Sequence, residues 1–281
     1  MNMQCISEEH VKSFGAYLIQ EEKCRGTAEK YLRDIRRFVI FLQGAPAGKE
    51  QVAGWKEHLI QAGYAPVTVN SMLAAVRCFF RFMGWDDRGI RYLRVQRRMF
   101  RESRKELSKE DYLRLSSAAQ QSGKQRLELL LETICATGIR VSEVSFITVE
   151  ALQRGTAEVS LKGKIRTILI PSKLCRKLLK YARKKKIASG EVFLTRSGKP
   201  VSRKQIWAEM KALCKTAGIE ASKVFPHNLR HLFARTFYKI TQDVAKLADV
   251  LGHSSIETTR IYLISTGAEH RLQLERMQLI N

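Results

Sequence analysis

The sequence lacks the signatures of several protein classes. It has no apolar run of about 18 residues, the length that a transmembrane helix requires. Residues 1–9 show no basic stretch followed by an apolar one, as a secretion signal would. Loops of the forms G-x-x-x-x-G-K-[ST] and G-x-G-x-x-G, which bind nucleotide phosphates, do not occur. We therefore expect a cytoplasmic protein that has no membrane partner and needs neither ATP nor a dinucleotide.

Cysteine is scarce and scattered. The 6 cysteines form no C-x-x-C pair, and none has a histidine neighbour at the spacing of metal ligands. We therefore predict no metal site and expect reduced, mostly buried thiols. The residues are Cys5, Cys24, Cys78, Cys135, Cys175 and Cys214.

Positive charge, by contrast, is abundant. The 281 residues are 44% hydrophobic and 27% charged, close to ordinary globular usage, and the length suits about two domains. Lysine and arginine number 50 against 27 acidic residues, which gives a formal net charge of +23. A charge this large indicates a polyanionic partner, nucleic acid above all, with an acidic membrane surface as the weaker alternative.

Residues 1–90 are predicted to form four helices. An apolar stripe over residues 11–18 marks the first helix, and the second follows an N-cap at Thr27. The third covers Glu50–Ala62. The fourth starts after Pro66 and ends at a C-terminal cap at Gly84, and the four together predict a small bundle.

Basic residues occupy the polar faces of these helices and the segment that follows. Lysine and arginine crowd residues 91–106, where few core residues occur, so we place a basic linker there. These residues are either solvated or in contact with nucleic-acid phosphates, and the net charge favours phosphates. The candidates for DNA binding are Lys30, Arg33, Arg37, Arg77, Arg81, Arg97 and Arg98.

Residues 107–281 mix helices with a little β-structure. Apolar residues around Lys162-Gly163-Lys164 predict a β-hairpin over 157–161 and 165–171, and 192–195 is predicted as a short strand. Ala268–Ile280 suits an amphipathic helix. The other predicted helices cover 113–119, 127–137, 174–185, 204–217 and 228–238. The predicted fold class is therefore mainly α, with a small β-hairpin or sheet in the second domain.

Four clusters in this second domain carry reactive residue types. Arg140 follows a glycine and precedes Glu143 by one helical turn, and Lys162 lies at the hairpin turn. His227 and Arg230 share one helix face. Alone, the first cluster is typical of a surface ion pair, the second of a solvent-exposed turn, and the third of a pair of residues with a structural role.

The fourth cluster extends from His253 to Tyr262. Ser254 and Glu257 form a sequence pattern that suits a capping box, which predicts a short helix carrying the tyrosine. Alone, Tyr262 would be read as a core aromatic. Taken together, however, the four clusters supply two arginines, a lysine, two histidines and a tyrosine. Such a set can surround a phosphodiester and stabilise its transition state while the tyrosine hydroxyl attacks phosphorus.

In these residues, their order and their spacing, the sequence resembles the tyrosine recombinase (integrase) family, and in particular its Xer-type branch. The resemblance implies an all-helical, SAM-like core-binding domain at 1–90, a basic linker at 91–106 and a catalytic domain at 107–281. The two domains would clamp duplex DNA.

The same resemblance implies a role for each site residue. Arg140 and Arg230 would form the phosphate clamp, Tyr262 would be the nucleophile, and His227 and His253 would complete the pocket. Glu143 would support Arg140. Lys162 would be the general acid and Lys164 a DNA contact, although the hairpin sequence leaves open which lysine has which role.

The implied activity is site-specific recombination through a 3′-phosphotyrosine, in DNA integration and excision or in dimer resolution. It would need no cofactor and no metal, because one phosphodiester is exchanged for another. The implied partners are double-stranded DNA and further copies of the chain in a tetramer on two DNA sites, with an accessory DNA-bending factor as an additional candidate. The alternatives are a type IB topoisomerase and a catalytically silent DNA-binding regulator. The tail helix would dock either on a neighbouring protomer or on its own domain.

Overall fold

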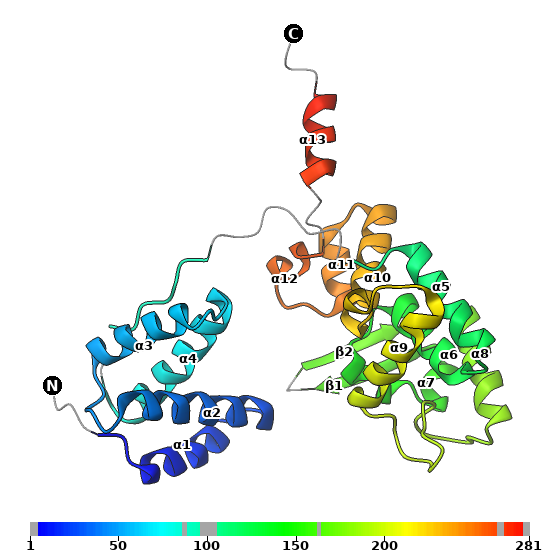
Figure 1. The fold of residues 1–281 in the computed structure, drawn as a ribbon. Helices are drawn as coiled ribbons and strands as arrows, with labels where there is room; N and C mark the ends of the chain where they lie inside the picture. The colour runs from blue at the N-terminus through cyan, green and yellow to red at the C-terminus, as the bar shows by residue number, and fades with distance from the viewer. Residues whose placement is uncertain (1–4, 86–88, 96–105, 162–163, 263–266, 278–281) are drawn as a thin grey trace. The chain divides into compact units, whose positions relative to one another are not determined.

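The structure is a computed structural model that describes residues 5–85, 89–95, 106–161, 164–262 and 267–277. The chain divides into two compact units, Met1–Arg97 and Arg98–Asn281. Figure 1 shows helices throughout, with a single small sheet in the second unit. This confirms the predicted mainly α fold class for the described residues. None of the described helices has the length and apolar character needed to cross a membrane.

The first unit is the predicted four-helix bundle. Its core is aromatic: Phe14 packs edge-on against Phe79 at a centroid distance of 5.1 Å, and Phe38 packs against Trp55 at 5.0 Å. All four rings are buried, so each helix contributes its apolar stripe to one core. The helices are α1 (Glu8–Gln20), α2 (Arg25–Leu42), α3 (Lys49–Gln61) and α4 (Pro66–Phe82).

One predicted helix start in this unit is wrong. Helix α2 begins at Arg25, after Cys24, and not after an N-cap at Thr27. The backbone N–H groups of Thr27 and Ala28 donate to the Cys24 carbonyl, so the first turn is already formed at Thr27. The Thr27 hydroxyl lies 3.0 Å from the Cys24 sulfur.

The second unit is built around helix α6, which contacts α5, α8, α9 and α10. The buried face of α6 includes Leu130, Leu131 and Ile134. Strands β1 and β2 form an antiparallel hairpin in which Thr156 pairs with Leu169 and Leu161 with Lys164. The elements in chain order are α5 (Lys109–Gln121), α6 (Gln125–Thr137), η2 (Val141–Phe146), α7 (Val149–Arg154), β1 (Thr156–Leu161), β2 (Lys164–Leu169), α8 (Ser172–Lys184), α9 (Arg203–Ala217), η3 (Ala221–Lys223), α10 (Pro226–Thr241), α11 (Val244–Leu251), α12 (Ile256–Arg260) and α13 (Gly267–Arg276).

Two predictions for this unit need correction. Residues 192–195 form no strand, because the pairing stops at the single bridges Thr148–Glu191 and Leu194–Pro200. Ser255, not Ser254, caps α12 by accepting a hydrogen bond from the Glu257 N–H. The helix ends at Arg260, so the tyrosine follows the helix instead of lying on it.

Candidate active site

The site begins where α6 ends. Gly138 caps the helix with φ +64°, and a Cβ there would lie 2.3 Å from the Phe233 ring, so only glycine fits. The Gly138 carbonyl accepts a hydrogen bond from Arg230 Nη1. The turn that stops α6 thus brings the segment containing Arg140 beside α10.

Arg140 and Glu143 form an ion pair in which the glutamate is buried and the arginine is partly exposed. Glu143 Oε2 accepts the Arg140 backbone N–H at 2.7 Å, and Glu143 Oε1 accepts Arg140 Nη1 at 2.9 Å. The Glu143 side chain is 3% exposed, whereas that of Arg140 is 42% exposed. Burial raises the pKa of Glu143, but the Arg140 N–H and the charge of Arg166 outweigh it and hold that pKa below its usual value. The carboxylate is therefore ionised, and the arginine faces outward.

Arg166, which the sequence analysis did not select, is the second partner of Glu143. It extends from β2, donates to Glu143 Oε2 through Nη2 and to the Val250 carbonyl through Nη1 at 3.2 Å. A signal was available in the strand alternation, because Arg166 lies two residues before buried Ile168 and therefore on the same face.

Arg230 is the centre of the site. It is 1% exposed and lies on α10. Its Nη2 donates to the Leu251 carbonyl at 2.8 Å and lies 3.0 Å from His253 Nε2, while its Nε donates to the Tyr262 hydroxyl at 3.4 Å. Burial, together with nearby arginines, lowers the pKa of Arg230, but an arginine remains charged at neutral pH. This one guanidinium therefore joins the end of α6, the end of α11 and the tyrosine.

Tyr262 is enclosed by imidazole rings. It is 3% exposed, and its ring is stacked on that of His253 at 5.6 Å with an interplanar angle of 14°. The ring centroids of His231 and His227 lie 4.3 and 6.0 Å from that of Tyr262. His231 was not among the predicted site residues, although its position one helical turn after His227 places both on one face of α10.

His253 has a defined proton position. An arginine only donates, so Nε2 of His253 accepts from Arg230, and the ring proton lies on Nδ1, 2.9 Å from the Thr259 hydroxyl. Burial, and then the charges of Arg230, Arg140 and Arg166, lower the pKa of His253 to about 4. The ring is thus neutral at pH 7.

Part of this group of residues borders a cavity of about 1160 Å³. Arg140, Glu143, Arg166 and His253 line it, together with Arg203 at the start of α9. Arg203 was not selected from the sequence. The cavity is large enough to admit a phosphate to the exposed side of Arg140.

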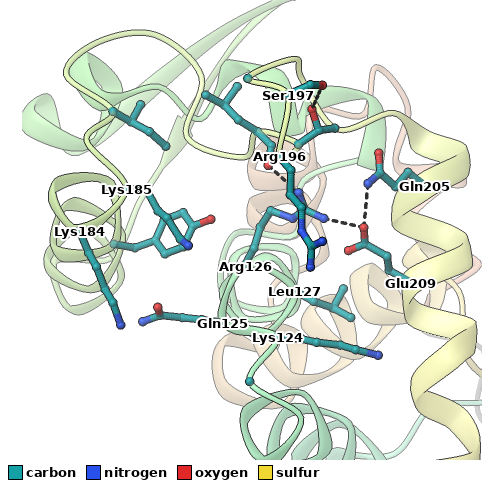
Figure 2. A pocket seen from close by; sticks show the side chains of 16 residues that line it. Lys124, Gln125, Arg126, Leu127, Lys184, Lys185, Arg196, Ser197, Gln205 and Glu209 are labelled. Carbon is teal, nitrogen blue, oxygen red and sulfur yellow. Dashed lines mark hydrogen bonds and ion pairs between the residues drawn. The ribbon is translucent and has the colours of Figure 1, made fainter.

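A second cavity, of about 1130 Å³, lies at the opposite end of α6 and contains none of the predicted site residues. Figure 2 shows Arg126 extending to Glu209, which also accepts from Gln205. Cations surround this pair at Lys124, Lys184, Lys185 and Arg196.

Four predicted residues lie wholly or partly outside the part of the chain that the structure describes. Lys162, Arg97 and Arg98 lie outside the described residues, as does the side chain of Lys164, whose backbone begins β2.

In the first unit, Lys30 already bonds Asp34 at 2.7 Å and the Ser71 carbonyl at 2.6 Å. Arg77 lies 5.9 Å from the centre of the Tyr92 ring. Of the residues predicted to bind DNA in this unit, Arg33, Arg37 and Arg81 are exposed to solvent. Among the residues that the structure describes, no group of histidine, cysteine, aspartate and glutamate is arranged to hold a metal.

Comparison with known proteins identifies both units. Residues 105–269 match the phage integrase family, and residues 11–87 match the phage integrase N-terminal SAM-like domain. The chain is 28% identical to tyrosine recombinase XerA of Pyrococcus furiosus over 287 residues, covering 100% of this chain and 98% of that protein.

Solved structures share the fold. A lambda integrase dimer bound to a COC′ core site matches with a TM-score of 0.73 at 18% identity, covering 91% of this chain and 94% of that one. A lambda integrase tetramer bound to a Holliday junction matches with a TM-score of 0.70 at 20% identity, covering 90% of this chain and 76% of that one.

Proposed function

The chain belongs to the phage integrase family, and on that premise we propose that it is a tyrosine site-specific recombinase that cuts and rejoins duplex DNA. One observation carries the proposal. The Tyr262 hydroxyl accepts a hydrogen bond from Arg230, a buried arginine within electrostatic range of Arg140, and the Tyr262 ring lies beside those of His227 and His253. A hydroxyl held against a fixed positive charge is suited to attack a phosphodiester.

In the proposed reaction, the Tyr262 oxygen bonds to phosphorus while the bond from phosphorus to the 5′ oxygen breaks. The tyrosine would give its proton to His227, an exposed imidazole whose ring centroid lies 6.0 Å from that of Tyr262. The leaving 5′ oxygen takes a proton from Lys162. The products are a 3′-phosphotyrosine and a free 5′ hydroxyl, so a second 5′ hydroxyl can reverse the step on another strand.

The two arginines would contact the nonbridging oxygens from opposite sides. Arg140 presents its exposed end directly, whereas the Nε donor of Arg230 is occupied by the Tyr262 hydroxyl. When the tyrosine moves to phosphorus, that donor becomes available to the phosphate. Neutral His253 then holds Arg230 in place without adding a charge of its own.

The assembly and the wider contacts are also proposals. The likeness to the lambda integrase tetramer supports four copies on two DNA sites. Helix α13 exposes Leu272 and Leu274, Met277 directly after it is also exposed, and docking of this tail on the next copy would close a ring. Exposed Arg33, Arg37 and Arg81 would contact phosphates from the first unit, with Arg77, Arg97, Arg98 and Lys164 as further contacts. A cytoplasmic location and an accessory DNA-bending factor stay predictions.

The decisive experiment uses a nicked suicide DNA that traps the covalent intermediate. Wild-type protein should form a DNA adduct resistant to denaturant, and should then join the cut strand to an added, different partner strand. A type IB topoisomerase would form the adduct but relax supercoiled DNA without exchanging partners between sites. A silent regulator would bind and give no adduct.

A further inference from the structure

Arg166 lies where three parts of the second unit meet. It originates on β2, reaches the Glu143 carboxylate on η2 and bonds the carbonyl of Val250 near the end of α11. Its side chain is 12% exposed, so the charge is largely removed from water. No step of the proposed reaction uses this residue.

The surroundings are shaped to admit this side chain. Gly252, in the turn before His253, has φ +64°, and a Cβ there would lie 2.3 Å from Arg166 Cδ. Any other residue at 252 would therefore displace the arginine or the turn. Arg166 Nε is buried and has no hydrogen-bond partner among the described residues. Burying the Arg166 guanidinium while its Nε donor lacks a hydrogen bond costs stability. The stability of the fold alone therefore does not explain why an arginine occupies this position.

The geometry at Glu143 shows what the charge does. Oε2 is occupied by Arg166 and by the Arg140 backbone N–H, so the Arg140 guanidinium reaches the carboxylate only through Nη1, at Oε1. A carboxylate facing a single arginine tends instead to take it in a two-pronged pair. Such a pair would turn the fork of Arg140 away from the cavity.

We propose that Arg166 is a positioning residue, which occupies one oxygen of Glu143 so that Arg140 keeps the rest of its fork for the scissile phosphate. The inference rests on the proposed function, since it presumes that Arg140 binds phosphate. It also accounts for the charge: two guanidiniums and one carboxylate leave a net positive cluster, and removal of Arg166 would leave a neutral pair.

The test combines Arg166→Met with Glu143→Gln. At saturating suicide DNA, Arg166→Met should slow single-turnover cleavage by about tenfold or more, because Arg140 is drawn onto Glu143. DNA affinity should change by less than about threefold. In the Glu143→Gln background the same change should cost less than about threefold, since no carboxylate is left to divert Arg140. Arg166→Lys should restore part of the rate, because it keeps the charge.

A matched control exists at the other end of α6. Arg126 also joins a carboxylate, Glu209 at 2.5 Å, to a carbonyl, Leu194 at 2.5 Å, and Figure 2 shows this pair. Arg126→Met should lower the unfolding midpoint about as much as Arg166→Met and leave the cleavage rate unchanged.

The outcomes separate the two claims. If wild-type protein forms no adduct, the proposed function fails. If wild-type protein forms the adduct and Arg166→Met cleaves at the wild-type rate, the inference about Arg166 is wrong. Equal losses from Arg166→Met with and without Glu143 would likewise overturn it, because they would mean that Arg166 acts only through general folding.

Discussion

The two ends of helix α6 hold cavities of similar size and opposite character. At the N-terminal end, Arg126 and Glu209 pair with side-chain exposures of 21% and 28%, surrounded by lysines on the surface. At the C-terminal end, Glu143 is 3% exposed and Arg230 is 1% exposed, and each is shared by several partners.

The two cavities are alike in volume and each is lined by several cations, so neither quantity distinguishes the proposed site from the other cavity. At the N-terminal end every cation except Arg126 reaches water, where salt and solvent screen it. At the C-terminal end Glu143 and Arg230 are desolvated, and the carbonyls of Gly138 and Leu251 fix Arg230, whereas the Arg140 side chain is 42% exposed. A fixed, desolvated charge acts strongly and without reorganisation on a charge that develops beside it. The predictions below test that contrast.

Tyr262→Phe should have the largest effect, a complete loss of the covalent adduct. Only the nucleophilic oxygen is removed, so DNA affinity should stay within about twofold of wild type. Gel analysis of the suicide reaction under denaturing conditions measures the adduct. The matched control is Tyr238→Phe, which removes a hydroxyl from a ring packed on the same cluster and should leave the adduct intact. A covalent band from the Tyr262→Phe protein would falsify the assignment of the nucleophile.

Lys162→Ala should slow cleavage by about 10²- to 10⁴-fold if Lys162 protonates the leaving oxygen. A substrate with a 5′-bridging phosphorothiolate should restore the rate, because a thiolate leaves without a proton. Lys164→Ala should show no such rescue. The opposite pattern would exchange the roles of the two lysines.

Arg140→Ala and Arg230→Ala should each reduce the cleavage rate by about 10²- to 10³-fold, since a fixed donor aimed at developing charge contributes about 3 to 4 kcal/mol. Substitution by lysine should restore little, because lysine lacks the two-pronged geometry. Arg126→Ala, at the other end of α6, should leave the rate unchanged. Comparable losses at both ends would remove the distinction between the two cavities.

The long helices were predictable because each carries a regular apolar stripe, and some of them also have a strong boundary residue. Pro66 and Gly84, for example, bound the fourth helix as predicted. Short helices α7 and α11 were missed, since so few residues show no clear period. The Thr27 prediction failed because a good capping residue does not exclude an earlier start.

The grouping of the site depended on contacts across the chain that no local pattern contains. Arg230 was predicted as a site residue, but its bonds to the Gly138 and Leu251 carbonyls join segments far apart in the sequence. Arg166 was missed because its partner Glu143 belongs to another element. Tyr262 was placed on a helix that in fact ends at Arg260, since the helix is too short for its end to be read from spacing.

The surface lysines of the N-terminal cavity should contribute little to either binding or cleavage. The double variant Lys124→Gln, Lys184→Gln should cleave within about twofold of wild type. Each phosphate contact contributes a slope of about 0.9 to the dependence of log affinity on log salt concentration, so an unchanged slope means that neither lysine contacts DNA. A slope reduced by about one or more would make this cavity part of the DNA-binding surface.

The smallest effect concerns His253 and the pH dependence of stability without DNA. Its pKa is lowered from 6.5 to about 4 in the folded chain, first by burial and then by the charge of Arg230. As the pH falls below about 6.5, the unfolded chain binds a proton at this residue that the folded chain does not, so the free energy of unfolding decreases. Glu143, whose pKa is lowered, adds a loss of stability only at still lower pH, whereas the raised pKa values of Glu128 and Glu191 affect wild type and a His253 variant alike. The difference in slope between the two proteins from about pH 6.5 to 5 therefore reports on His253.

His253→Gln should therefore flatten the decrease in that window, because glutamine does not titrate while its amide still offers an acceptor to Arg230. Urea unfolding at about pH 7, 6 and 5 measures the slope for both proteins. Parallel slopes would mean that folding does not lower the pKa of His253. A wild-type protein that instead gains stability over His253→Gln as the pH falls would mean that the folded chain holds His253 protonated. In that case a third positive charge would join the two arginines at the phosphate, and the neutral role given to His253 would have to be abandoned.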